Sequence, residues 1–208
     1  MVQIARRPDV CFPQSMLTTD IRQPERGFSL VEVLVVTALS TVIMAMAVVQ
    51  IGTSRATMNA DNAMRLVMGE LARSRDAAIQ QRRLMRVAFV NLNQVTAERK
   101  DAAAAVYTLL RRATMEGNVR FALPAGTPDT TDAFGAGGAL DFDGANPTND
   151  VCFNGDGMLV RCTTGTVING TVFLAAPNDQ FATRAVTILG STGRVRAFRR
   201  QNTIWDRV

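Results

Sequence analysis

The residue types that carry out most protein chemistry are sparse in this sequence. There is no histidine, which excludes a Ser-His-Asp triad and any metal site with imidazole ligands. Three features remain: a lone carboxylate, Glu32, in a long apolar run; a cysteine pair, Cys152 and Cys162; and a group of arginines near the C-terminus. No recognisable spacing of Cys, Ser-Lys or paired carboxylates indicates a catalytic site, so the sequence predicts no enzyme, no cofactor and no bound metal.

Glu32 is the only charged residue between Phe28 and Ile51. A helix over this stretch would be about 36 Å long, enough to cross a hydrocarbon core of about 30 Å. Four arginines precede the stretch. The positive-inside tendency therefore predicts a single membrane span with a cytoplasmic N-terminus and everything after Ile51 outside the cytoplasm.

Two simpler interpretations do not account for Glu32. A secretory signal peptide would have a shorter apolar region and a small-residue cleavage site, and "VVQIGTSRATM" after the run contains none. A plain membrane anchor explains the length and the flanking charges but not the acid. Because an ionised carboxylate in hydrocarbon costs at least a few kcal/mol, we expect Glu32 to have a partner.

The stretch "RGFSLVEVLVV" resembles the processing motif of type IV prepilins and of type II secretion pseudopilins. The resemblance implies cleavage after Gly27 by a prepilin peptidase, N-methylation of Phe28, and assembly with other pilins or pseudopilins into a filament. The new amine of Phe28 would have an unperturbed pKa of about 7.7 to 8 and would be largely cationic at neutral pH. In a filament it would pair with Glu32 of the neighbouring subunit and neutralise both charges.

The leader, residues 1–27, is long for this class of protein. Translation from Met16 would give the compact charged leader "MLTTDIRQPERG". We therefore expect Met16 to be the true start.

After the apolar run the sequence becomes amphipathic. Apolar residues recur at helical spacing with arginines between them. The recurring positions are Ala60, Met64, Val67, Leu71 and Ala78. We predict one helix from Phe28 to the mid-eighties, with a membrane or filament-core half over 28–51 and an amphipathic half over 52–88.

Residues 89–208 are predicted to form a β-rich globular domain, which makes the fold class α+β with antiparallel sheets. "LMRVAFVNL", "AAVYTLL" and "NVRFALP" read as strands, although "DAAAAVYTLLRRATM" could equally be a helix. Residues 124–157 are rich in Gly, Pro, Asp and Thr and predict a long loop. "VCFNGDG" and "GTVINGTVFLAAP" follow, and "RAVTILGSTGRVRAFRRQ" predicts a hairpin around Ser191, Thr192 and Gly193.

This tail of strands resembles the H-type pseudopilins, a family that includes the FimT-like minor pilins. The similarity is carried by F-x-x-x-G at Phe153 to Gly157 and by G-R-V-R at Gly193 to Arg196. It implies a long helix against antiparallel sheets. It also implies an inner-membrane protein with a periplasmic domain, whose partners are other subunits, the peptidase and membrane lipid.

The cysteines and the aspartates each allow two interpretations. Outside the cytoplasm Cys152 and Cys162 could form a disulfide, which we favour over two free thiols. The stretch "DFDGANPTND" offers oxygen ligands for calcium, but it lacks the EF-hand pattern, and we favour turns. Its oxygen-bearing residues are Asp141, Asp143, Asn146 and Asp150.

The C-terminal stretch "RVRAFRRQNTIWDRV" holds five arginines and one acid. In FimT-like minor pilins a C-terminal Gly-Arg-x-Arg motif is associated with DNA capture, so the resemblance implies an alternative function, DNA binding during transformation. Basic clusters can neutralise phosphates. The candidate residues are Arg194, Arg196, Arg199 and Arg200. Two other interpretations stay open: arginines that protect a sheet edge, and a contact with an acidic neighbouring subunit.

Overall fold

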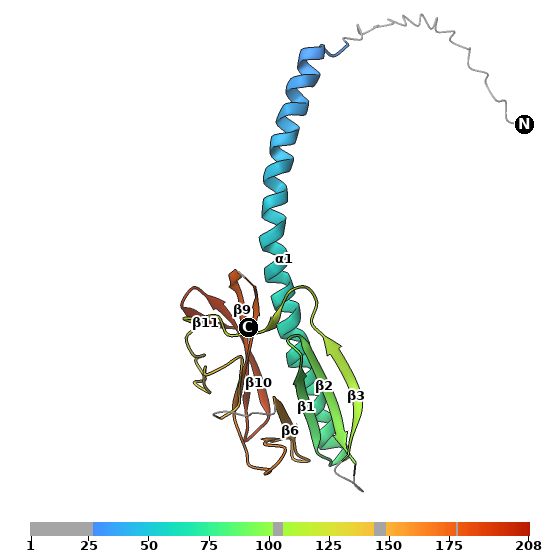
Figure 1. The fold of residues 1–208 in the computed structure, drawn as a ribbon, viewed down its shortest axis with the longest axis vertical. Helices are drawn as coiled ribbons and strands as arrows, with labels where there is room; N and C mark the ends of the chain where they lie inside the picture. The colour runs from blue at the N-terminus through green and yellow to red at the C-terminus, as the bar shows by residue number, and fades with distance from the viewer. Residues whose placement is uncertain (1–26, 102–105, 144–148, 178) are drawn as a thin grey trace, which may run out of the picture. The chain divides into compact units, whose positions relative to one another are not determined.

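The computed structural model describes residues 27–101, 106–143, 149–177 and 179–208. Within this part the chain forms one helix followed by eleven strands (Figure 1). The elements are α1 (Leu30–Gln81), β1 (Met85–Val90), β2 (Gln94–Lys100), β3 (Tyr107–Thr114), β4 (Arg120–Phe121), β5 (Leu140–Asp141), β6 (Asp150–Phe153), β7 (Leu159–Val160), β8 (Gly170–Ala176), β9 (Asp179–Leu189), β10 (Arg194–Gln201) and β11 (Ile204–Arg207). The chain divides into two units, residues 1–44 and residues 45–208.

The start of α1 is apolar and unpacked. From Leu30 to Ala47 the mean hydropathy is 2.2 and no residue is buried, so this stretch is long and apolar enough to cross a membrane. The hydroxyls of Thr37, Ser40 and Thr41 each donate to a backbone carbonyl three or four residues earlier, at 2.7 to 2.9 Å. These polar side chains are therefore satisfied within the helix itself.

In the second unit the later part of α1 packs through one stripe. The five apolar residues predicted at helical spacing are each at most 1% exposed, which confirms the prediction of an amphipathic helix with a buried face. Apolar residues of both sheets join the same core. The helix is therefore the element that the two sheets share.

The helix ends earlier than the sequence predicts, at Gln81 and not between the mid-eighties and residue 88. Arg82 takes the left-handed conformation with φ 48°. The amide of Arg82 donates to the carbonyl of Ile79 at 3.4 Å, and the amide of Arg83 to that of Ala78 at 3.3 Å. This is the hydrogen-bond pattern of a Schellman cap, here with arginine where glycine is usual, so the sequence carries no glycine to mark the end.

The first sheet is antiparallel with the strand order β3-β2-β1-β6-β7. Strand β1 lies in the predicted stretch "LMRVAFVNL" and pairs with β2 from Met85 opposite Arg99 to Val90 opposite Gln94. The sequence does not predict strand β2, because three of the seven residues in "QVTAERK" are charged. The segment "DAAAAVYTLLRRATM", for which the sequence allowed either a helix or a strand, contains strand β3. Residues 102–105, which precede β3, lie outside the described part.

A short polar contact closes the β2–β3 hairpin. The hydroxyl of Thr108 donates to the carboxylate of Asp101, and this bond holds the pKa of Asp101 below its usual value, with Arg99 adding to the effect. The carboxylate therefore stays ionised at neutral pH, at the exposed end of the hairpin.

The second sheet has the order β11-β10-β9-β8-β4, and β5 also pairs with β8. The predicted hairpin is confirmed: Arg194 pairs with Leu189 and Arg199 with Arg184, across a turn at residues 190–193. A second hairpin follows between β10 and β11, turning at Asn202 with φ 55°. Strand β11 is a further strand that the sequence does not predict.

The predicted loop over 124–157 is only partly a loop. Strand β5 interrupts it, and β6 begins at Asp150 and lies beside β1 in the first sheet. The reason is tertiary pairing: β5 and β6 are two and four residues long, and each lines up with a longer strand that specifies its register. The part from 124 to 139 contains no strand.

The interior contains two hydrophobic clusters, and each includes aromatic side chains. In the main core Phe89 contacts Phe121 edge to face and stacks on Phe142, with ring centroids 5.3 and 5.8 Å apart. A smaller cluster contains Phe173, Ala185, Phe198 and Trp205. Since Trp205 is the only tryptophan of the chain and is 5% exposed, its fluorescence reports on the unfolding of the second sheet.

Candidate functional site

The predicted processing site lies just before the helix. Gly27 and Phe28 precede the first helical residue, Leu30, and have no regular secondary structure. Phe28 is 80% exposed, and no atom lies near the position where a side chain on Gly27 would begin. The peptide bond between Gly27 and Phe28 is thus exposed, in a segment that a peptidase could bind in extended form. The leader up to residue 26, with Met16, lies outside the described residues.

Glu32 occupies the first turn of α1 and is exposed. It borders a shallow hollow of about 220 Å³ that Phe28 and Val36 also line. Of the polar side chains described between Leu30 and Ala47, the hydroxyls bond to the helix backbone, whereas no hydrogen bond or ion pair is found for Glu32. A carboxylate in the first turn also has a favourable interaction with the helix dipole. The predicted cleavage site before Phe28 and the unpartnered acid Glu32 therefore lie at the same end of the helix.

Cys152 and Cys162 form a disulfide in the structure. Cys152 lies in β6 and is fully buried, and Cys162 follows β7, which pairs with β6 at Cys152 opposite Val160. The bridge therefore closes the short β6–β7 hairpin at the edge of the first sheet.

Replacing Cys152 and Cys162 together by serine is expected to lower the free energy of unfolding by about 2 to 3 kcal/mol, because the disulfide limits the freedom of the unfolded chain. The measurement is urea unfolding of the full chain in lipid nanodiscs, followed by Trp205 fluorescence. A reductant should shift the wild-type midpoint toward that of the double variant and leave the variant unchanged. An unchanged wild-type midpoint under full reduction would contradict the prediction.

The four candidate DNA-binding arginines are not equivalent. Arg196 forms an ion pair with Asp132, which also accepts the hydroxyl of Thr187 at 2.6 Å. Arg199 donates to Asp61 of α1 at 2.7 Å. Arg194, by contrast, is exposed, and within the described part of the chain its guanidinium has no acceptor.

Arg200 is nearly buried and binds the loop that starts at residue 124. Its Nε donates to the carbonyl of Asn202 at 2.7 Å, and its terminal nitrogens donate to the hydroxyl of Thr127 at 2.9 Å and to the carbonyl of Gly126 at 3.4 Å. The indole of Trp205 donates to the carbonyl of Pro128 at 3.0 Å. Arg200 and Trp205 of the C-terminal hairpin therefore hold this loop in place, so Arg200 has a structural role.

A buried arginine that the sequence does not reveal lies beside this group. Arg184 of β9 is fully buried, and its Nε lies 2.5 Å from Oδ1 of Asp61. One terminal nitrogen donates to the carbonyls of Phe181 and Thr183 at 2.8 and 2.9 Å. Asp61 thus binds both Arg184 and Arg199 and ties α1 to the second sheet. No local pattern marks Arg184 as buried, because its partner lies 123 positions earlier.

The aspartates considered for calcium have other partners. Asp141 accepts the amide of Gly137 at 2.7 Å, Asp143 accepts the amide of Asn169 at 2.9 Å, and Asp150 lies 2.9 Å from Nε of Arg86. Asn146 lies outside the described residues. Within the described part, no group of three or more acidic or cysteine side chains could hold a metal ion.

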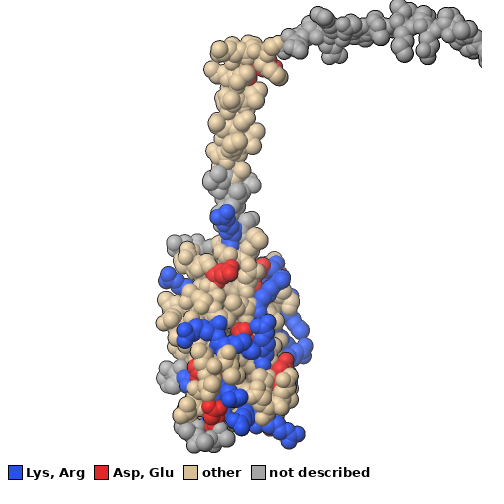
Figure 2. All heavy atoms as spheres, turned by 90° about the vertical axis from the view of Figure 1, so that its right-hand side faces the viewer, with Lys and Arg blue, Asp and Glu red and all other residues tan. Residues whose placement is uncertain are grey.

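The charge pattern of the second unit is mixed. Figure 2 shows Lys and Arg side chains spread over one face of residues 45–208, with Asp and Glu side chains between them. This face therefore carries both signs of charge and is not purely basic.

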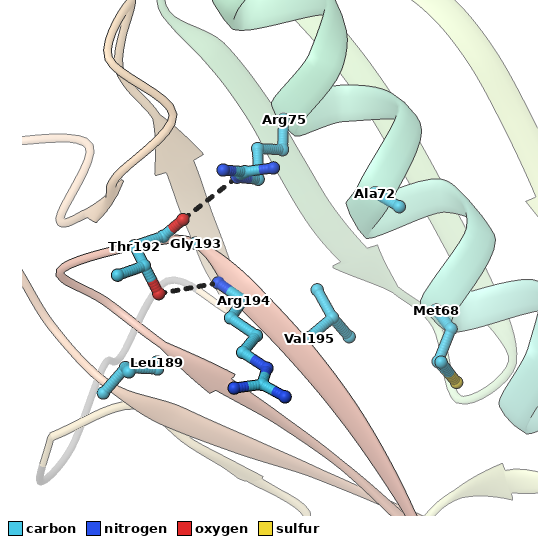
Figure 3. A pocket seen from close by; sticks show the side chains of 8 residues that line it. All are labelled: Met68, Ala72, Arg75, Leu189, Thr192, Gly193, Arg194 and Val195. Atoms are coloured by element: carbon cyan, nitrogen blue, oxygen red, sulfur yellow. Dashed lines mark hydrogen bonds between the residues drawn. The ribbon is translucent and has the colours of Figure 1, made fainter. Parts of the chain in front are cut away.

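A groove of about 490 Å³ lies between α1 and the β9–β10 hairpin (Figure 3). Arg75 reaches from α1 to the turn, where its Nε donates to the carbonyls of Thr192 and Gly157 at 3.1 and 3.3 Å. Gly193 has φ 63°, and a side chain there would begin 2.0 Å from the carbonyl oxygen of Gly157. The glycine of the G-R-V-R motif is thus required by close backbone packing, and Arg75 fixes both turns.

Comparisons with known proteins identify the N-terminal segment. Residues 22–48 match the family described as the prokaryotic N-terminal methylation motif, so the chain carries the prepilin-type motif. No curated protein matches the chain.

Solved structures that are similar to this chain include a minor pilin and a minor pseudopilin. The type IV minor pilin FimU of Pseudomonas aeruginosa has a TM-score of 0.46 and 14% identity, covering 70% of this chain and 91% of that one. The minor pseudopilin EpsH of the Vibrio cholerae Type 2 Secretion System has a TM-score of 0.45 and 13% identity, covering 68% and 97%. At this level of identity, the motif match is the finding that identifies the N-terminal segment.

Proposed function

We propose that this protein is a minor subunit of a pilus-like filament, of the type II secretion pseudopilus or type IV pilus class. A prepilin peptidase cleaves it after Gly27 and methylates Phe28. The apolar part of α1 holds it in the inner membrane, with residues 89–208 in the periplasm, until it is assembled with other subunits. Its role is structural and not enzymatic.

The observation that supports this function is the position of Glu32. The apolar stretch of α1 keeps one acid in its first turn, where the described residues offer it no partner, while the hydroxyls of Thr37, Ser40 and Thr41 in the same stretch are satisfied. A lone carboxylate in hydrocarbon is unfavourable by at least a few kcal/mol. Cleavage at Gly27 would create a cationic amine on Phe28 at the same helix end, and in a filament the amine of one subunit would neutralise Glu32 of the next.

DNA binding through the C-terminal arginines is the alternative, and the geometry does not favour it. The charges of Arg196 and Arg199 are each balanced by an aspartate, and Arg200 is nearly buried against the loop after residue 124. Arg194 is the one of the four with a free guanidinium in the described part of the chain. One free arginine would neutralise a single phosphate, which gives little affinity.

Glu32→Gln is expected to leave the protein in the membrane but to lower its amount in the filament at least about tenfold, because the charge that the amine of Phe28 pairs with is lost. The measurement compares the two fractions by immunoblot after filaments are sheared from cells. Ser40→Ala is the matched control, since its hydroxyl bonds only to the carbonyl of Val36. Equal incorporation of the Glu32 variant and the control would contradict the proposed function.

A further inference from the structure

The groove between α1 and the β9–β10 hairpin has a lining with two distinct parts (Figure 3). Met68 and Ala72 of α1 and Leu189 and Val195 of the two strands form an aliphatic surface. Figure 3 shows Met68 and Ala72 on the helix side and Leu189 on the strand side. Its volume of about 490 Å³ is in the range of binding pockets, about 300 to 1,000 Å³.

Two guanidinium groups border this aliphatic surface. Arg75 uses its Nε for the two turns, and its nearest acid is the exposed Asp76, whose Oδ1 is 3.9 Å from a terminal nitrogen, too far for a hydrogen bond. The side chain of Arg194 has no acceptor in the described part of the chain; the bond to the hydroxyl of Thr192 at 3.3 Å comes from its backbone amide. The terminal donors of both arginines are therefore available to a carboxylate.

We propose that the groove binds a segment of another protein in which an acidic residue stands next to an aliphatic one. The aliphatic side chain would pack between Ala72 and Val195, and the carboxylate would accept hydrogen bonds from Arg194. The proposal needs no filament: the groove belongs to residues 45–208 alone, so its failure and that of the proposed function are separate outcomes.

The lining favours a peptide over a nucleic acid. Single-stranded nucleic acids bind through base stacking on aromatic side chains together with cations. The groove is lined by aliphatic side chains, a threonine, a glycine and two arginines, without an aromatic residue. The arginines therefore favour an anionic group in the ligand, and the aliphatic lining favours an aliphatic side chain next to that group.

Methionine-methyl NMR of the full chain in phosphatidylcholine nanodiscs tests the proposal, because Met68 lines the groove while Met64, one turn earlier, is buried in the core. The probe is the blocked peptide acetyl-Gly-Leu-Glu-Leu-Gly-amide, and its control has Gln in place of Glu. The acidic peptide should shift the Met68 methyl signal in a saturable manner and leave Met64 unchanged. The Gln peptide should bind about tenfold more weakly.

Two variants separate the groove from general charge effects. Arg194→Gln, which removes no side-chain hydrogen bond or ion pair found in the described structure, should weaken binding of the acidic peptide about tenfold. Arg207→Gln, an exposed arginine on β11 outside the groove, should leave the affinity unchanged. The proposal is wrong if Met68 does not respond, if both peptides bind equally, if both variants act alike, or if oligothymidylate shifts Met68 at lower concentration than the acidic peptide.

Discussion

Asp61→Ala is expected to lower the free energy of unfolding of the second unit by about 3 to 5 kcal/mol. The carboxylate of Asp61 is the acid that balances Arg184, which is fully buried, and it also binds Arg199. Removing it leaves a guanidinium in the core whose remaining acceptors, among the described residues, are the carbonyls of Phe181 and Thr183. In the unfolded chain the guanidinium of Arg184 is solvated by water. In the folded variant it is buried without its carboxylate, so the cost of its desolvation is no longer offset and the folded state is destabilised.

The measurement is urea unfolding of the full chain in nanodiscs, monitored by Trp205 fluorescence. Asp76→Ala is the matched control: it lies on the same helix, its side chain is 61% exposed, and its ion pair with Arg75 is 3.9 Å long. Its effect should stay within about 0.5 kcal/mol. Similar losses for the two variants would show that Arg184 does not depend on Asp61.

Gly193→Ala is expected to destabilise the protein by at least about 2 kcal/mol. The residue has φ 63°, which an L side chain rarely adopts, and the added carbon would lie 2.0 Å from the carbonyl oxygen of Gly157 and 2.7 Å from Nε of Arg75. The contact is with backbone, so it cannot be relieved by a rotamer change. Both turns would have to move apart.

Gly69→Ala, the same substitution at another position, is expected to change the free energy of unfolding in the opposite direction. Gly69 lies inside α1, and no atom lies within 4 Å of the position of its added carbon. Alanine should therefore raise the free energy of unfolding by about 1 kcal/mol, the difference in helix propensity. The two variants are compared by thermal unfolding, measured by far-UV circular dichroism. A neutral Gly193→Ala would contradict the packing of the two turns.

The parts of the fold that the sequence predicts are those with a regular local signal. The buried stripe of α1 follows from the spacing of its apolar residues, and the β9–β10 hairpin follows from the turn residues Ser191, Thr192 and Gly193. The helix end at Gln81 does not follow, because Arg82 takes the place of the usual glycine. Strand β2 does not follow either, because its charged residues obscure the alternation.

The C-terminal arginines show where sequence reasoning about a site fails. Read as a sequence, Arg196, Arg199 and Arg200 form a basic cluster with one acid nearby. In the fold their acceptors come from elsewhere: Asp132 and Thr127 in the loop after residue 124, and Asp61 in the helix, 138 positions before Arg199. Local composition cannot reveal such pairs, since only the packing of α1 on the second sheet brings them together.

The most direct test of the proposed filament role is the intact mass of the protein extracted from the membrane. If an amine created by cleavage serves to balance Glu32, the extracted chain should begin at Phe28 and carry the added mass of one methyl group on its N-terminus. A membrane form that still carries the residues before Phe28, with no methyl group on Phe28, would contradict the account.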